Sequence, residues 1–224
     1  MNFPKTIIVL AMVALSLPAS APADAQDFSA EFNSALEQFN DKDFARSAVA
    51  FRSIADAFSA RHVQSDGQRY YCASGANEAQ FYTVLHVTEP IAVDVLGPEW
   101  CEALFYLAYS DVELGDTAGA LEALDQAIAV APLNSHYEIE RGFVLRSMGQ
   151  LDEAMEAYHS AIRHAESVGD RTKTWKALSL RGIGWIHAER KNWDEAEKAY
   201  RDSLEIEPGN KIAESELQYI KENR

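Results

Sequence analysis

Apolar and small residues recur every three or four positions through most of the chain, which is the spacing of one face of an α-helix. The closing stretch WDEAEKAYRDSLEIEP, from Trp193 to Pro208, shows the arrangement most clearly. A small residue is followed by an aromatic residue four positions on, and by a second small residue three further on. Two upstream stretches place residues in the same three slots, each after a short turn. The matched positions are Ala120, Leu124 and Ala127; Ala154, Tyr158 and Ala161; and Ala196, Tyr200 and Ser203.

The distances between these stretches indicate a repeat. Ala120 and Ala154 are 34 positions apart, whereas Ala154 and Ala196 are 42 apart. The excess of eight falls in SVGDRTKT, a polar stretch between predicted helices, where an insertion is tolerated. A fourth unit opens the body of the chain, after the turn DKDF. Its three slots hold Ser47, Phe51 and Ile54.

With small, aromatic and small residues, a closing proline and a period of 34, the chain resembles the tetratricopeptide repeat (TPR) family. The resemblance covers nearly all of residues 28–208. It implies an all-α fold, a right-handed α-solenoid of stacked antiparallel helix pairs. The predicted array spans residues 26–209, with four recognisable repeats. Residues 210–224 fit a C-terminal capping helix, with Ile212, Leu217 and Ile220 facing inward.

The first helices of the units match the family pattern less closely than the second helices do. Leu104, Leu107 and Ala108 fit the expected slots in one unit. In the unit that starts near Ser135, however, Glu138 and Arg141 stand where apolar residues are expected. These two charged residues leave the packing of that helix open, although not its existence.

Residues 60–100 are the irregular part of the chain, which we interpret as a degenerate fifth unit. GQRYYCASGANEAQFYTVLHV reads as a long first helix with N-cap oxygens from Ser65 and Asp66, and EPIAVDVLGPEW as a second, short apolar segment. This interpretation brings Cys72 and Cys101 near the N-terminal ends of adjacent parallel helices. They then form either a disulfide or two separate packed thiols. Neither has neighbours that suit zinc ligation or a catalytic thiol.

The N-terminus reads as a bacterial export signal. One charged residue precedes an apolar run from Thr6 to Leu17, which is too short for a stable membrane anchor. Ala23 and Ala25 form an A-x-A site, so we expect cleavage before Gln26 and a signal peptide over residues 1–25. The expected location is the periplasm or the outside of the cell, and a retained membrane anchor is the alternative.

The charge balance limits the partners. The formal net charge is -15 at pH 7, which disfavours nucleic acid and anionic membranes, because binding to phosphates needs Lys and Arg. Basic or apolar partners remain. No later stretch of the sequence approaches the length of a membrane span, so no membrane insertion is expected after cleavage.

No catalytic or cofactor-binding pattern emerges. The chain has no GxSxG, HExxH or P-loop motif. His159 and His164 are five positions apart and do not share a helix face, so joint metal ligation is not expected. Carboxylates such as those of WDEAE are interpreted as a solvated surface. We therefore expect no enzymatic activity, no metal and no cofactor.

The resemblance also implies a binding surface, because in the family the first helix of each unit lines a concave groove. Aromatic residues dominate the corresponding slots, and they either form an exposed groove or serve mainly in packing. The family's chaperone-tail binders use a clamp of Lys, Asn and Arg. Only Arg146 and Arg181 could contribute to such a clamp here. The slots hold Phe105, Tyr106, Tyr109, Glu140, Phe143, Arg146, Arg181 and Trp185, with Tyr71 from the irregular unit.

The expected function is that of a non-enzymatic protein–protein interaction scaffold in the cell envelope. Its groove would hold a peptide or a helix of a protein partner, because a few buried anchors suit that mode of recognition. One alternative is a structural protein whose repeats associate into a homo-oligomer. Another is an enzyme or ligand carrier that uses residues 60–100 as a pocket.

Overall fold

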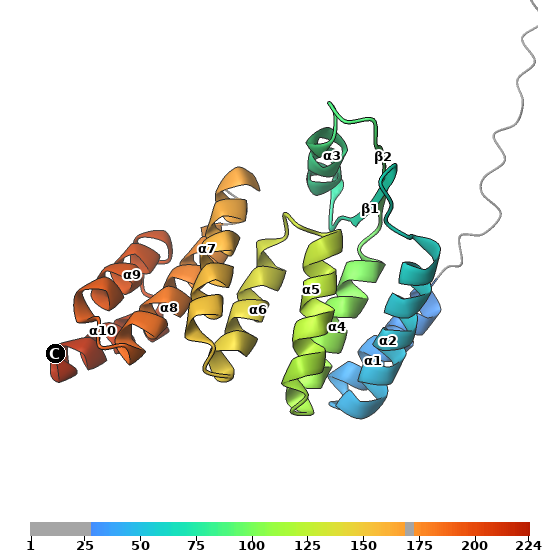
Figure 1. The fold of residues 1–224 in the computed structure, drawn as a ribbon. Helices are drawn as coiled ribbons and strands as arrows, with labels where there is room; N and C mark the ends of the chain where they lie inside the picture. Colours follow the sequence, from blue (N-terminus) through green and yellow to red (C-terminus); the bar gives the residue numbers. More distant parts are fainter. Residues whose placement is uncertain (1–27, 169–172) are drawn as a thin grey trace, which may run out of the picture.

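The structure is a computed structural model that describes residues 28–168 and 173–224 (Figure 1). The predicted signal peptide, residues 1–25, lies outside the described residues. The elements are α1 (Ser29–Asn40), α2 (Phe44–Arg61), β1 (Gln68–Cys72), α3 (Ala76–Leu85), β2 (Ala92–Leu96), α4 (Glu99–Glu113), α5 (Thr117–Val130), α6 (Ser135–Ser147), α7 (Leu151–Val168), α8 (Lys173–Glu189), α9 (Trp193–Ile206) and α10 (Lys211–Asn223). None of the described helices is both long and apolar enough to cross a membrane.

Four antiparallel helix pairs stand side by side in chain order, namely α1 with α2, α4 with α5, α6 with α7, and α8 with α9 (Figure 1). Each pair packs on the next, since α2 lies against α4, α5 against α6, and α7 against α8. The predicted all-α array of stacked helix pairs is thereby confirmed.

The repeat slots are the places where the helices pack most closely. The twelve residues assigned to them are at most 3% exposed. Each turn within a pair has one residue with positive φ at the same point, which ends the first helix in a left-handed conformation: Lys42, Gly115, Gly149 and Lys191.

Residues 60–100 are not a degenerate repeat, and here the sequence interpretation is wrong. β1 and β2 form a two-stranded parallel sheet with α3 as the crossover. Aromatic and β-branched residues favour strands at RYYC and IAVDVL. Gly97 directly follows β2, and Gly75 is the N-cap residue of α3. Ser65 caps no helix but bridges to Gln68 in a turn. Because α2 packs directly on α4, this β1–α3–β2 segment is an insertion between the first and second pairs.

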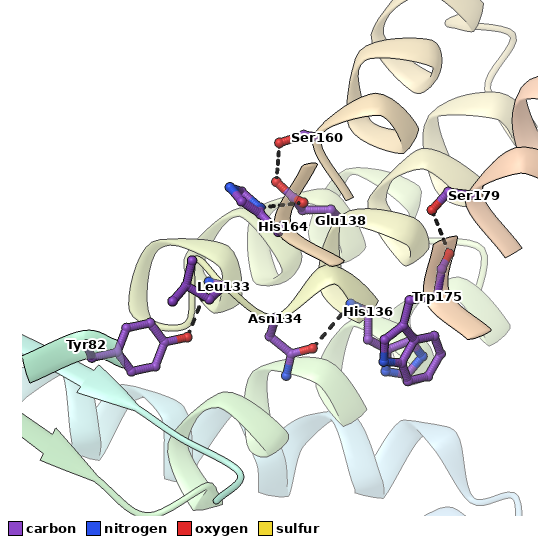
Figure 2. A network of polar contacts seen from close by, with 9 residues as sticks. All are labelled: Tyr82, Leu133, Asn134, His136, Glu138, Ser160, His164, Trp175 and Ser179. Atoms are coloured by element: carbon purple, nitrogen blue, oxygen red, sulfur yellow. Dashed lines mark hydrogen bonds and ion pairs between the residues drawn. The ribbon is translucent and has the colours of Figure 1, made fainter. Parts of the chain in front are cut away.

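A buried polar network surrounds one of the unexpected charged residues of α6, the first helix of the third pair. Glu138 is only 7% exposed and accepts hydrogen bonds from Ser160 Oγ at 2.6 Å and from His164 Nδ1 at 2.9 Å (Figure 2). Both donors lie on α7, so the carboxylate joins the two helices of the pair. Arg141 instead forms an ion pair with Asp125 of α5. A buried carboxylate is tolerated when it is hydrogen-bonded in this way.

Helix α10 covers the last pair. Ala213 and Ile220 are buried beside Tyr200, and Leu217 is partly buried against them. The prediction that Ile212 faces inward is wrong, because it is 64% exposed. Positions 213, 217 and 220 share one helix face at a spacing of four and three, whereas position 212 lies to the side of that face.

Candidate partner-binding groove

The first helices of the last three pairs line three adjoining hollows, which we together call the groove. One part lies between α4 and α6 and a second between α6, α8 and α10, and both are lined by Glu140 and Phe143. A third part, at the junction with the β1–α3–β2 insertion, shares Phe105 with the first. The groove therefore runs across three repeats.

The structure brings together eight of the nine residues that the sequence placed in a partner-binding groove. All eight line one of the three parts, and all come from α4, α6 or α8. They are Phe105, Tyr106, Tyr109, Glu140, Phe143, Arg146, Arg181 and Trp185.

The aromatic residues of the groove divide into exposed rings and packed rings. Phe143 is 46% exposed and Tyr109 is 43% exposed. Tyr106 is half-buried and stacks on Phe51, with ring centroids 5.2 Å apart, and burial raises the pKa of its hydroxyl. Tyr106 thus holds the first two repeats together, while Phe143 and Tyr109 offer apolar surface to a ligand.

The charged residues of the groove are already engaged within the protein. The Arg146 guanidinium lies 4.5 Å from the ring centroid of Trp185 and 5.1 Å from that of Phe143, in cation–π geometry. Arg181 forms an ion pair with Glu207 at 2.6 Å. Because Glu207 offsets the Arg181 charge, the groove offers a partner few unpaired cations.

Tyr71 does not belong to the groove, and that prediction is wrong. It lies on β1 and is 7% exposed. Its ring stacks on Tyr82 of α3, and its hydroxyl lies 2.7 Å from His86 Nε2. The error follows from reading a strand as a helix, because a strand turns alternate side chains into the insertion's own core.

The structure joins Cys72 and Cys101 in a disulfide, with the Cα atoms 6.1 Å apart. Their surroundings differ from the sequence interpretation. Cys72 ends β1 and Cys101 lies in the first turn of α4, so the bond connects a strand to a helix rather than two parallel helices. It fastens the insertion to the second repeat.

Sequence reasoning missed several residues of the groove because they lie ahead of the slots that the family pattern marks. Glu102 comes one turn before Tyr106, and His136 one turn before Glu140. The His136 ring stacks on Trp175, with centroids 4.4 Å apart (Figure 2). The centroid of the His136 ring lies 4.9 Å from that of Phe105. The sequence shows that Glu102 and His136 lie one helical turn before predicted groove residues. It does not show that Phe105, His136 and Trp175, from three different helices, lie close together.

The described part of the chain holds no group of three or more His, Cys, Asp or Glu side chains arranged to bind a metal ion. Its ion pairs lie partly within one helix, as between Arg201 and Glu197 of α9, and partly between helices, as between Arg141 of α6 and Asp125 of α5.

Comparisons with known proteins agree with this architecture. The tetratricopeptide repeat family matches residues 102–133 and 134–207. No curated protein sequence is significantly similar to the chain. Two crystal structures of nearly identical TPR-like repeats, from a putative kinesin light chain of Podosopora anserina, are 12% and 13% identical to it. Each match covers 87% of this chain and 85% of the other, with a TM-score of 0.59.

A third solved structure is the first TPR of Spaghetti (RPAP3) bound to the HSP90 peptide SRMEEVD. It is 19% identical, and the match covers 55% of this chain and 94% of that one, with a TM-score of 0.49. At such identities the likeness concerns the fold. Together, the family matches and the helix packing define the class of fold, which is an all-α tetratricopeptide helical repeat array.

Proposed function

We propose that this chain is a non-enzymatic scaffold of the bacterial cell envelope, which binds a peptide or helix of a partner protein in its groove. Arrays of stacked repeats use the surface created by their curvature to bind extended ligands. The observation that carries the proposal is the exposure of Phe143 at the centre of the groove, where it lines two of the three parts.

An apolar anchor suits this surface better than an acidic tail does. Exposed aromatic rings in a hollow are the residue types that dominate binding energy at protein interfaces. The two arginines of the groove that could bind a carboxylate are already engaged, since Arg181 is paired with Glu207 and Arg146 lies over two rings. The partner segment is therefore an extended strand or an amphipathic helix with apolar anchors.

Export from the cytoplasm is part of the proposal. It rests on the export signal read from residues 1–25 and is supported by the Cys72–Cys101 disulfide, since disulfides persist in oxidising compartments. N-terminal sequencing of the protein from a periplasmic fraction should begin at Gln26. Recovery of the uncleaved chain from the cytoplasm would refute this part.

The groove is tested by placing a photo-crosslinking residue, benzoylphenylalanine, at Phe143 in living cells. The matched control carries it at Tyr219, which is 51% exposed on α10 and does not line the groove. A partner should be captured at position 143 and not at position 219. With the purified partner segment, Phe143→Ala should then weaken binding about tenfold or more, and Tyr219→Ala should leave it unchanged.

The same experiment distinguishes a scaffold that binds a partner protein from a protein that associates with itself. Crosslinks between two copies of this chain at position 143, together with a mass that rises with concentration in light scattering, would make the groove a homo-oligomer interface. Equal crosslinking at positions 143 and 219 would remove the groove assignment.

A further inference from the structure

A pocket lies where the β1–α3–β2 insertion meets the repeats, and we call it the junction pocket. It encloses about 450 Å³. One wall is the segment from Ser74 to Glu78, which comprises the end of the connection after β1 and the first turn of α3. The others come from α4, from the connection between α5 and α6, and from Trp175 at the start of α8. The side chains used below are those of Glu78, Glu102, Phe105, Ser135, His136 and Trp175.

The insertion wall is fixed from two sides. The Cys72–Cys101 disulfide anchors the end of β1 to α4, two residues before the segment that lines the pocket. On the far side, the backbone N–H of Leu133 donates to the Tyr82 hydroxyl at 3.3 Å (Figure 2). A binding site with pre-positioned walls spends less free energy on ordering when the ligand enters.

The pocket contains one carboxylate without a partner. Glu78 is engaged, because it accepts hydrogen bonds from the Ser74 backbone N–H and from the Tyr82 hydroxyl. Glu102 is half-buried, and within the described residues no hydrogen bond or ion pair reaches its carboxylate. Burial raises the pKa of Glu102, and the nearby Glu99 raises it further. A carboxylate removed from water without a counter-charge is unfavourable.

The surroundings of Glu102 favour a cation. No lysine or arginine is among the described residues that line the pocket. Phe105 lies one turn along the same helix, and the stacked rings of His136 and Trp175 continue from it. Aromatic faces attract ammonium and guanidinium groups, and they do so more strongly where water is excluded.

A second polar group also lacks a partner. Ser135, which lines the pocket at the start of α6, is 1% exposed, and its Oγ has no hydrogen-bond partner in the described structure. Buried hydroxyl groups are nearly always hydrogen-bonded. Ser135 therefore leaves an unsatisfied polar atom in the wall of the pocket, beside the unpaired carboxylate of Glu102 in the same lining.

We propose that the junction pocket binds an arginine or lysine side chain of the partner peptide, with Glu102 as counter-charge and the rings of Phe105 and Trp175 beside the cation. This inference rests on the proposed function, since the junction pocket is the third part of the groove and shares Phe105 with the first part. The occupant is a basic residue of that peptide because Phe105 lines both this pocket and the first part of the groove, and because the chain carries a net charge of -15. Apolar anchors along α6 and α8 then give affinity, and the basic residue sets the register.

The test uses the disulfide-bonded protein and two small probes of equal shape. Nα-acetyl-arginine methylamide carries the cation, and Nα-acetyl-citrulline methylamide replaces it by a neutral urea group. The readout is the NMR signal of the Trp175 indole N–H, assigned through Trp175→Phe. The arginine probe should shift this signal saturably, and the citrulline probe should bind at least about fivefold more weakly.

Variants locate the effect. Glu102→Gln keeps the shape of the side chain and should weaken the arginine probe about fivefold. Glu122→Gln, on the exposed face of α5, removes the same charge away from the pocket and should have no effect. Equal binding of the two probes, no saturable shift, or unchanged binding to Glu102→Gln would each overturn the proposal.

Failure here is distinguishable from failure of the groove. If the partner segment crosslinks at position 143 but binds equally well after each of its basic residues is replaced by citrulline or alanine, the groove stands and the junction pocket does not. If the arginine probe binds in the pocket and no segment crosslinks at position 143, the cation site stands as a site for a free organic cation. The proposal of a peptide side chain is then wrong.

Discussion

The Tyr158 ring of α7 lies between Gly142 of α6 and Gly182 of α8. A Cβ atom at Gly182 would lie 2.5 Å from the ring, and one at Gly142 would lie 2.8 Å from it. Both distances are well below van der Waals contact. The ring is 2% exposed, and burial raises its pKa to about 12. The two glycines therefore leave the space that the Tyr158 ring fills, between its own repeat and the following one.

Gly182→Ala should destabilise the protein, although alanine favours a helix by about 1 kcal/mol over glycine. Overpacking against Tyr158 should outweigh this gain, with a net loss of about 1 to 2 kcal/mol in the free energy of unfolding. Urea denaturation of the single variant measures it. In Tyr158→Leu the smaller side chain should tolerate Gly182→Ala, so the two changes should be non-additive. Additive effects would contradict the proposed contact.

The alanine slots give a second prediction. Ala154 and Ala196 are fully buried, whereas Glu195 beside Ala196 is exposed. Ala154→Leu or Ala196→Leu should force the helix pair apart and cost about 1 to 3 kcal/mol. Glu195→Ala should change stability by no more than about 0.5 kcal/mol. Similar small effects at all three positions in thermal denaturation would argue against this register.

The array was predictable from the sequence because each repeat applies the same local rule. A small residue at Ala120, Ala154 or Ala196 and a bulky one four positions later can pack only between helices, and four copies make the period visible. The groove residues of α4, α6 and α8 followed from that period. The same rule failed for Tyr71, where no repeat exists.

The insertion and the junction pocket could not be predicted from the repeat pattern. The stretch that contains Arg69 to Cys72 is short and apolar, and such stretches fit a strand or a buried helix segment equally well. The pairing of Gln68–Cys72 with Ala92–Leu96 joins residues that are distant in sequence. The proximity of Glu102, His136 and Trp175 likewise depends on the packing of three helices, which local patterns do not encode.

The disulfide should stabilise the insertion more than the array. Reduction should lower protection against hydrogen exchange over residues 68–96, because the Cys72–Cys101 bond closes a loop with a sequence separation of 29 and so restricts the unfolded segment. Chain-entropy arguments give about 3.5 kcal/mol for a loop of this size. Amides of α6 to α9 should keep their protection. The control is the Cys72→Ala, Cys101→Ala double variant, which should resemble the reduced protein and not respond to reductant.

If reduction instead increased exchange uniformly along the array, the insertion would be a structural part of the repeats. Unchanged exchange over residues 68–96 would show that the hydrogen bond between Leu133 and Tyr82, with the packing around Tyr71, is sufficient to hold the insertion.

His187 makes the stability of the last repeat depend on pH. Burial lowers its pKa below the usual value; the nearby Arg190 and His159 also lower it, and Glu195 partly opposes them. Its Nδ1 atom is buried without a hydrogen-bond partner in the described structure. The folded state therefore prefers the neutral ring. Below the unfolded-state pKa of about 6.5 the unfolded chain binds a proton that the folded chain resists, so this stabilising contribution is present above that pH and lost below it.

The variant His187→Phe removes the titrating group and keeps an aromatic ring at this position. The free energy of unfolding of the natural chain, measured relative to that of His187→Phe, should fall as the pH decreases from 7.5 to 5. Urea denaturation of both proteins at matched pH and ionic strength isolates this difference from the many carboxylates that both share. A constant difference across the range would mean that the His187 ring is protonated as easily in the folded protein as in the unfolded chain.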